Sequence, residues 1–290
     1  MKAKVKEEME LVDAVMVLLA TASKSTVKRL IKNGRVAVGR KVQTRADLVV
    51  AKGAEVEILP EPQHAARTRR VTEATLPFKI LHEDAQIIVV DKPSGMLSIA
   101  TEKEKLRTVY RMVSDYLKTK DVASRIFIVH RLDRDVSGVM VLAKNEKSKR
   151  TMQKGWASAR KLYIAVVEGR PKPETGTVRT WLCQNKAMRV YVCEQTAYGA
   201  EEAVTHYRTL KSAKGRSLVE VNIETGRKHQ IRVHMAHIDC PVAGDETYGG
   251  LEKIKGGIAL HAAELEFDHP ATDKRMKFTS PTPARMKGLV

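Results

Sequence analysis

The chain has 290 residues, of which 43% are hydrophobic, so it is long and apolar enough for two folded domains and is not disordered as a whole. Lys and Arg outnumber Asp and Glu by 52 to 34, and the resulting net charge of +18 indicates a polyanionic partner such as a nucleic acid. The sequence holds no apolar stretch of the ~20 residues that a membrane span needs, and "MKAKVKEEME" turns acidic where a signal peptide would turn apolar.

Residues 11–60 are predicted to form a small α/β domain. "VDAVMVLLATAS" has the apolar character of a buried helix. "SKSTVKRLIKNGR" predicts a second helix, with Ser25 as its N-cap and Gly34 at its C-terminal end. "RVAVGRKVQ" then predicts two short strands around Gly39, and "AKGAEVEILP" predicts a turn and a further strand.

The same segment carries a run of basic side chains. Eight basic residues and no acidic residue lie between Lys24 and Arg45, whereas a solvated face usually mixes both signs. We therefore expect the helix and hairpin to bind phosphates, although a role in solubility alone is the alternative. The expected RNA-binding residues are Lys28, Arg29, Lys32, Arg35, Arg40 and Lys41.

This segment resembles the small RNA-binding module first seen in ribosomal small-subunit protein four. The resemblance rests on the apolar first helix, on "VKRLIKNGRVAV" and on the closing "KGAEVEIL". It departs at the hairpin, where the family often has Asn-Gly and this chain has Gly39-Arg40.

Residues 61–78 contain two prolines and no apolar period, so they are predicted to be a linker. Residues 79–290 are predicted to form one larger α+β domain. Its β-branched runs are "AQIIVVDKP", "IFIVHRLD", "VMVLA", "LYIAVVEG" and "SLVEVNI", with helical patterns such as "TVYRMVSDYLKTK" between them. Because strands and helices do not alternate regularly, we expect a mixed, mostly antiparallel sheet flanked by helices and loops.

The densest group of charges is "HRLDRDVSG", residues 130–138, directly before the apolar run "VMVLA". If 126–133 is a strand, Arg131 and Asp133 share one face, and Asp133 ends the strand where it can face a cleft. Taken alone, this stretch favours a solvated turn residue at Asp133. Asp133 and Asp135 are too close in the chain to flank a sugar, which argues against a glycosidase.

Three cysteines, Cys183, Cys193 and Cys240, cannot all pair and show no CxxC spacing. They indicate a reducing, cytoplasmic environment and argue against a disulfide framework and a structural zinc site. His229, His234, His237 and Cys240 form a local cluster, but their spacing matches no metal motif, so no metal is expected.

Several segments in order resemble the RluA-type RNA pseudouridine synthases. They run from about Ile80 to Pro283 and read "VVDKPSG", "HRLDRDVSG", "KLYIAVVEG", "TGRKHQIRVHMAHIDCPVAGDETYG" and "LHAAELEFDHP". The resemblance implies a pseudouridine synthase that needs no cofactor, with RNA as its partner.

The resemblance also implies roles for individual residues. Asp133 matches the catalytic aspartate, and Tyr163 matches the tyrosine that lies against the target base and is a candidate for proton transfer. Arg232 matches the basic residue that pairs with the aspartate, and Arg131 an arginine that helps to displace the target nucleotide. Val136 departs from the family, which usually has Thr there.

The expectation is thus a cytoplasmic, monomeric RNA pseudouridine synthase acting on large-subunit ribosomal RNA. The alternatives are a synthase acting on tRNA and a non-catalytic RNA-binding ribosome-assembly factor. A glycosidase-type hydrolase, which would release free base, is a weaker alternative.

Overall fold

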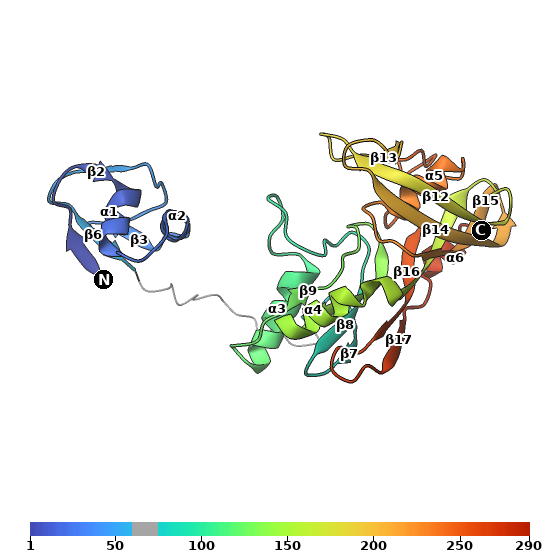
Figure 1. The fold of residues 1–290 in the computed structure, drawn as a ribbon, viewed down its shortest axis with the longest axis horizontal. Helices are drawn as coiled ribbons and strands as arrows, with labels where there is room; N and C mark the ends of the chain where they lie inside the picture. Colours follow the sequence, from blue (N-terminus) through green and yellow to red (C-terminus); the bar gives the residue numbers. More distant parts are fainter. Residues whose placement is uncertain (60–74) are drawn as a thin grey trace. The chain divides into compact units, whose positions relative to one another are not determined.

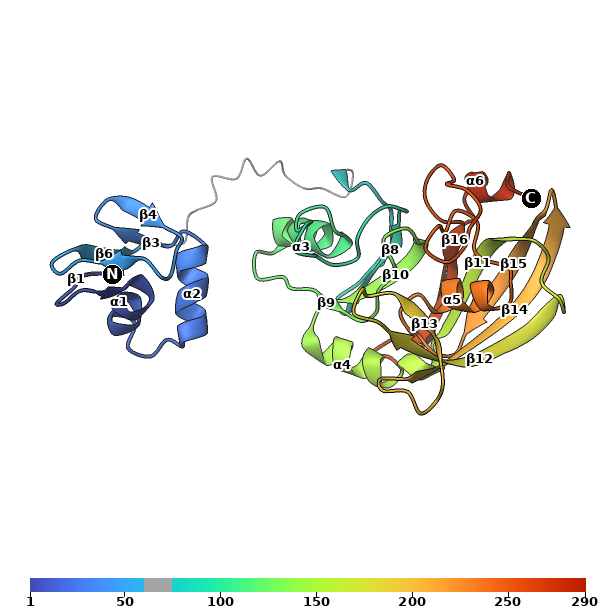
Figure 2. The same ribbon diagram turned by 90° about the horizontal axis from the view of Figure 1, so that it is seen from above.

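The computed structural model describes residues 1–59 and 75–290 (Figure 1 and Figure 2). The chain divides into two compact units, Met1–Arg69 and Arg70–Val290. Most of the predicted linker, 61–78, lies outside the described residues.

Within residues 1–59, the first unit has two helices and six short strands. In chain order they are β1 (Lys2–Lys4), β2 (Met9–Glu10), α1 (Leu11–Leu18), α2 (Lys24–Lys32), β3 (Val36–Val38), β4 (Lys41–Gln43), β5 (Val49–Val50) and β6 (Glu55–Ile58). Four strands form a sheet in the order β1-β6-β3-β4, and β2 pairs with β5. The unit therefore begins before residue 11, because β1 pairs with β6.

The local predictions for this unit hold, apart from one cap. The β3–β4 hairpin is confirmed, and Gly34 directly follows the last residue of α2 and its cap with a φ of +67°. The predicted N-cap at Ser25 is wrong. Ser23 caps α2 instead, because its side chain accepts a hydrogen bond from the backbone N–H of Thr26 at 3.3 Å.

The second unit is built on one large sheet. Its strands are β7 (Ile80–Glu83), β8 (Ile87–Lys92), β9 (Phe127–Ile128), β10 (Ser137–Ala143), β11 (Arg160–Glu168), β12 (Thr175–Gln184), β13 (Val190–Cys193), β14 (Glu201–Ala213), β15 (Arg216–Ile223), β16 (Leu260–Asp268) and β17 (Arg275–Thr279). Its helices are α3 (Val109–Lys120), α4 (Glu146–Lys154), α5 (Gln230–His237) and α6 (Ala284–Lys287), with a 3₁₀ turn at Trp156–Ser158. Across the described residues, the helices are too short or too polar to span a membrane.

The sheet runs in the order β13-β12-β14-β15-β11-β16-β10-β8-β7, with β17 beside β16 and β9 beside β10. Neighbouring strands are antiparallel except for β10 and β16, which pair in parallel. The expected α+β class with a mixed, mostly antiparallel sheet is therefore confirmed.

Continuous apolar runs form β8 and β10 because helices cover both faces of these strands. Ile88 and Met140 belong to the cluster of buried side chains that includes Val113 of α3. Val89 and Val141, which point to the opposite face, pack in the cluster that includes Met152 of α4. The side chains of α5 join the first of these clusters, so α3 and α5 cover the same face.

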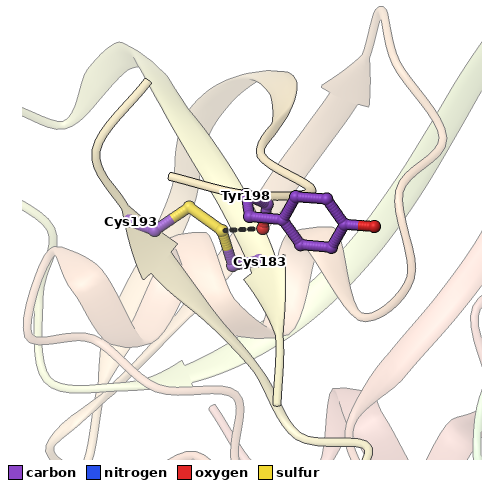
Figure 3. Close-up of a disulfide and its surroundings, with 3 residues drawn as sticks. All are labelled: Cys183, Cys193 and Tyr198. Carbon is purple, nitrogen blue, oxygen red and sulfur yellow. Dashed lines mark hydrogen bonds between the residues drawn. A yellow bond between two sulfur atoms is a disulfide. The ribbon is translucent and has the colours of Figure 1, made fainter. Parts of the chain in front are cut away.

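A disulfide connects β12 and β13, contrary to the prediction from the odd cysteine count (Figure 3). Cys183 and Cys193 lie ten residues apart, and the antiparallel hairpin brings their Cα atoms to 5.9 Å. This distance is typical of disulfides. Three cysteines exclude complete pairing but not one local pair, and Cys240 stays free and buried.

We predict that Gly138→Ala unfolds the second unit at a much lower denaturant concentration. Gly138 has a φ of +115° and pairs with Ala262, and a Cβ atom there would overlap the backbone of Ala262. We expect a loss of about 4 kcal/mol or more in unfolding free energy. The measurement is urea unfolding followed by Trp fluorescence, because Trp156 and Trp181 both lie in this unit.

The control is Gly95→Ala. Gly95 also has a positive φ, +82°, but a Cβ atom there meets no neighbour within 4 Å. It should cost only about 1–2 kcal/mol, the price of a left-handed backbone. Equal losses in the two variants would contradict the steric argument.

Candidate active site

Asp133 lies on the loop between β9 and β10. The predicted strand over 126–133 is wrong, because within it only Phe127–Ile128 pairs with β10. The backbone of Leu132 is instead satisfied by a side chain: Ser98 Oγ donates to its carbonyl oxygen at 2.6 Å and accepts from its N–H at 3.1 Å. The loop is thereby held without a neighbouring strand.

Lys92 also holds this loop, through a side chain that is fully buried. Its ammonium group donates to the backbone carbonyl oxygens of Pro93, Met96 and Arg134, at 3.0, 2.7 and 3.0 Å. Burial lowers the pKa of Lys92 to about 8, against the opposing charges of Asp135 and Asp133. Two segments about forty residues apart are thus joined next to Asp133.

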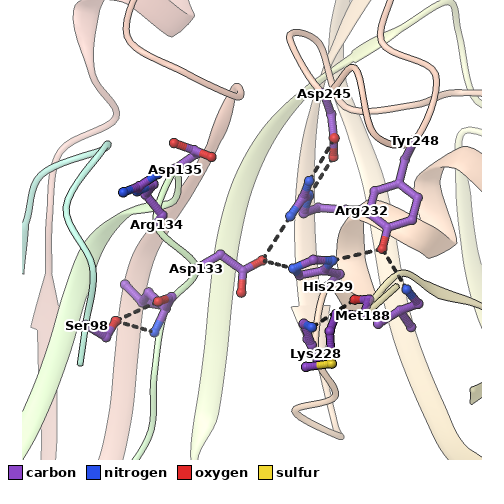
Figure 4. A network of polar contacts seen from close by, with 12 residues as sticks. Ser98, Asp133, Arg134, Asp135, Met188, Lys228, His229, Arg232, Asp245 and Tyr248 are labelled. Carbon is purple, nitrogen blue, oxygen red and sulfur yellow. Dashed lines mark hydrogen bonds and ion pairs between the residues drawn. The ribbon is translucent and has the colours of Figure 1, made fainter. Parts of the chain in front are cut away.

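The Asp133 carboxylate is 31% exposed and makes both of its contacts through Oδ2. Oδ2 lies 3.4 Å from Nη1 of Arg232 and 3.7 Å from Nε2 of His229 (Figure 4). Among the described residues, Oδ1 has no hydrogen-bond or ion-pair partner. The Asp135 carboxylate points away from this cluster.

Arg232 is shared between two carboxylates, and Asp133 is the more distant one. Its Nε and Nη2 donate to the two oxygens of Asp245 at 2.6 and 2.8 Å, in a bidentate pair that is almost completely buried. The guanidinium also lies 5.0 Å from the ring centre of Tyr248. Burial would lower the pKa of Arg232, but the hydrogen bond and charge of Asp245 and the charge of Asp133 outweigh it and raise that pKa. Arg232 therefore stays charged beside Asp133.

The start of α5 sets the position of Arg232. The buried side chain of Gln230 is anchored to four groups, which are the Val204 carbonyl oxygen, the Thr205 hydroxyl, the Thr225 hydroxyl and the Arg227 backbone N–H. Ile231 and Met235 face the core, as the predicted apolar stripe requires. Arg232 consequently leaves the helix toward Asp133.

Tyr163 enters the site from β11. The pairing of β11 with β16 shifts register between Leu162 and Tyr163, and such an irregularity redirects a side chain. Burial, with a smaller contribution from the charge of Asp133, raises the pKa of Tyr163, so its hydroxyl stays neutral. That hydroxyl has no hydrogen-bond partner among the described residues, which leaves it available to a ligand.

Asp133, Tyr163 and Arg232, which the sequence selected, line one pocket with a cavity volume of about 80 Å³. This volume is smaller than that of a typical small-molecule site. Arg131 lies at the same pocket with an exposed side chain, whereas Val136, in the place of the usual Thr, is buried in its wall. The charged and polar residues that line the pocket are one aspartate, three arginines, one histidine and a neutral tyrosine: Asp133, Arg131, Arg227, Arg232, His229 and Tyr163.

The cluster that could suggest a metal site is dispersed in the structure. Both ring nitrogens of His234 bond to threonine hydroxyls, those of Thr205 and Thr180, at 2.8 and 2.9 Å. His229 faces Asp133, and His237 is exposed. No group of three or more potential ligands is arranged for a metal ion within residues 1–59 and 75–290.

Three residues that shape the site had no role from sequence reasoning: Lys92, Asp245 and Tyr248. Each lies in a segment that carries the resemblance, "VVDKPSG" or "PVAGDETYG". The signal that could have identified these residues is their place in the family segments. Their contacts could not be predicted, because they depend on how distant segments pack together.

We predict that Asp245→Asn destabilises the second unit by about 3–5 kcal/mol, because it leaves the buried Arg232 charge without its closest partner. Urea unfolding followed by Trp fluorescence measures this loss. Asp239→Asn is the matched control, since Asp239 is exposed and Asn tolerates its φ of +58°. The control should stay within about 0.5 kcal/mol of wild type. A similar effect of both variants would show that the buried pair is not the cause.

Comparison with known proteins agrees with this site. A family model described as "RNA pseudouridylate synthase" matches residues 86–237. "Uncharacterized RNA pseudouridine synthase YlyB" of Bacillus subtilis is 32% identical, over 92% of this chain and 88% of that protein. "Ribosomal large subunit pseudouridine synthase D" of Pseudomonas aeruginosa is 33% identical, over 90% of this chain and 84% of that protein.

The fold is also found among solved structures. The structure titled "Human RNA Pseudouridylate Synthase Domain Containing 4" matches with a TM-score of 0.58 and 25% identity, and the match covers 72% of this chain and 90% of that one. The chain has an α+β fold and a pocket with a carboxylate, and its relatives align over most of both chains. This protein therefore belongs to the RNA pseudouridylate synthase family, isomerases that convert uridine in RNA to pseudouridine.

Proposed function

We propose that this enzyme isomerises uridines of large-subunit ribosomal RNA. The observation that supports this substrate is the similarity to the ribosomal large subunit pseudouridine synthase D of Pseudomonas aeruginosa, which is 33% identical over 90% of this chain. A tRNA substrate remains the competing outcome of the experiment below.

The reaction defines what the pocket must do. The C1′–N1 bond breaks, the uracil turns, and C1′ joins C5; the C5 proton is lost and N1 gains one. Nothing is oxidised and no group is added, so the chemistry needs no cofactor. The free uracil must stay in place and be shielded from water until it rejoins the sugar.

We assign the acting carboxylate to Asp133. It is partly exposed in the pocket, and Oδ1 has no partner among the described residues, so this oxygen is free to meet the sugar. Either attack on C1′ or removal of the 2′ proton requires an ionised carboxylate, and Nη1 of Arg232 lies 3.4 Å from Oδ2 of Asp133.

Tyr163 and Arg131 have supporting roles in this proposal. Tyr163 lines the pocket and, with its raised pKa, meets the uracil as a neutral phenol that can donate a hydrogen bond. If Tyr163 takes part in proton transfer, its neutral hydroxyl must give up its proton before it can accept one. Arg131 is exposed at the pocket, where it can occupy the space that the flipped nucleotide leaves.

The first unit is proposed to be an RNA-binding module like that of ribosomal small-subunit protein four. Five of its six expected RNA-binding residues have exposed side chains: Lys28, Arg29, Lys32, Arg40 and Lys41. Arg35 differs, because it is half-buried and donates through Nε and Nη2 to the Leu59 carbonyl oxygen at 3.3 and 3.0 Å. We therefore assign Arg35 to the structure of the unit and the other five to phosphate contacts.

We further propose that the enzyme works as a monomer in the cytoplasm. The Cys183–Cys193 disulfide does not support a reducing compartment, so this location rests on the proposed substrate alone.

We predict that the double variant Lys28→Gln, Lys32→Gln binds RNA with a weaker salt dependence. Both side chains are exposed on α2, and each lost phosphate contact lowers the slope of log Kd against log salt by roughly 0.7–0.9, so the pair should lower it by about 1.4–1.8. Lys147→Gln, Lys154→Gln on α4 removes the same charge from exposed positions and should leave the slope unchanged. Equal slopes for the two double variants would contradict an RNA-binding first unit.

We predict that Asp133→Asn abolishes pseudouridine formation. A strain without the gene is complemented with wild type, Asp133→Asn or Asp135→Asn, and pseudouridine is mapped across ribosomal RNA and tRNA. Wild type should restore sites in large-subunit RNA, and Asp133→Asn should restore none. Asp135→Asn makes the same change two residues away on a carboxylate that points elsewhere, and it should restore the sites.

Each other result has a defined meaning. If wild type restores pseudouridine in tRNA and not in large-subunit ribosomal RNA, the substrate is tRNA and the proposed substrate is wrong. Restored sites with Asp133→Asn would overturn the role of Asp133. Full loss in both variants would point to a paired-carboxylate mechanism.

A further inference from the structure

His229 and Tyr248 lie behind Asp133, and neither has a role in the proposal above. His229 directly precedes α5 with a left-handed φ of +54°, which only a few residue types adopt readily. Its Nδ1 lies 2.8 Å from the Tyr248 hydroxyl, and its Nε2 lies 3.7 Å from Oδ2 of Asp133 (Figure 4). The imidazole therefore bridges a phenol and the carboxylate.

Tyr248 is held on two sides. Its oxygen accepts a hydrogen bond from the backbone N–H of Val190 at 3.2 Å, and its ring lies against the Arg232 guanidinium. The residue is 8% exposed, and burial, the largest effect, raises the pKa of its hydroxyl. Tyr248 is thus a fixed, protonated hydroxyl whose own hydrogen is available to His229.

These contacts select one tautomer of His229. The groups that face it are Asp133, Arg232, Lys228, Asp245 and Tyr248, and burial lowers its pKa, so the ring is neutral near pH 7 and carries one proton. If that proton were on Nδ1, the bare Nε2 would face the negative Oδ2. With the proton on Nε2, Nδ1 accepts from Tyr248 and Nε2–H points at the carboxylate.

We propose that His229 and Tyr248 are a positioning pair: Tyr248 directs the His229 proton to Nε2, and Nε2–H joins Arg232 in holding Oδ2 of Asp133, so that Oδ1 faces the substrate. This inference rests on the proposed role of Asp133. It explains why both contacts of Asp133 fall on one oxygen. The 3.7 Å separation between Nε2 and Oδ2 becomes a hydrogen bond if the partly exposed carboxylate moves slightly, as catalytic contacts often do when substrate binds.

Two substitutions of His229 separate positioning from mere folding. Gln places an amide nitrogen near the position of Nε2 and can still donate to Asp133. Asn places it near Nδ1, where it reaches Tyr248 but not Asp133, and Asn tolerates the left-handed backbone. His237→Asn is the control, because His237 is exposed on α5.

Single-turnover rates and RNA affinity are measured on unmodified large-subunit ribosomal RNA transcribed in vitro. His229→Asn should slow isomerisation by roughly 10- to 100-fold, the effect of losing one hydrogen bond to a charged group, with Kd for RNA unchanged. His229→Gln should recover most of the rate, and His237→Asn should match wild type. A wild-type rate for His229→Asn, or a His229→Gln rate as low as that of His229→Asn, would overturn the proposal.

A spectroscopic measurement tests the tautomer without any substrate. In protein labelled with ¹⁵N-histidine, the resonances missing from His229→Asn identify His229, and their shifts should report a proton on Nε2. Tyr248→Phe keeps the ring beside Arg232 but removes the hydroxyl, and it should move proton population toward Nδ1. An Nδ1-protonated His229 in wild type, or no change in Tyr248→Phe, would refute the pair.

The two proposals fail in different ways. An active Asp133→Asn variant would remove the proposed role of Asp133, whatever the tautomer of His229. An inactive Asp133→Asn variant together with a fully active His229→Asn variant would overturn the positioning pair alone.

Discussion

The buried ion pair of Arg232 with Asp245 is the interaction on which the site depends. Two of the three guanidinium nitrogens are committed to Asp245, so the third, Nη1, can face Asp133 in only one direction. A pair this deeply buried is costly to form in water-free surroundings, and it is stable here because both partners are satisfied by short, bidentate hydrogen bonds. The ion pair with Asp245 thus offsets the free-energy cost of burying Arg232. Asp133 has a fixed positive charge beside it and still remains partly exposed.

The carboxylate itself needs a rigid support, because it stands on a loop. Ser98 brackets the backbone of Leu132, and Lys92 holds the carbonyl oxygen of Arg134. Lys92 is the last residue of β8, and Ser98 lies in the segment that follows it. A buried ammonium destabilises the folded state unless it is well paired, and the pKa of Lys92 falls to about 8 because burial outweighs the charges of Asp135 and Asp133. Three carbonyl partners compensate it, and the result is a carboxylate whose backbone position is determined on both sides.

The division of charge between the two units follows the same logic. In the first unit, the Lys and Arg side chains that we propose as phosphate contacts are exposed, which suits attraction to a phosphate backbone of any sequence. In the second unit, Arg232 is paired with Asp245 and faces Asp133, and Tyr163 lines the same pocket as a neutral phenol. The proposed phosphate contacts and the proposed catalytic residues therefore lie in different units, so each set can be substituted without the other.

The sequence alone determined the elements that depend on local patterns. Apolar periodicity identified α2, α3 and the strands β8, β10, β11 and β15, and the order of the motifs identified the family together with Asp133, Tyr163 and Arg232. Only the tertiary structure decided the partners of these residues. Asp133 and Arg232 are 99 residues apart, and their meeting depends on the pairing of β10 with β16 and on the docking of α5. For the same reason the sequence did not reveal Asp245 as the closer partner of Arg232, or His229 as a neighbour of Asp133. Periodicity reports which face of an element is buried, whereas the distance between two side chains on different elements is set by how the whole sheet is assembled.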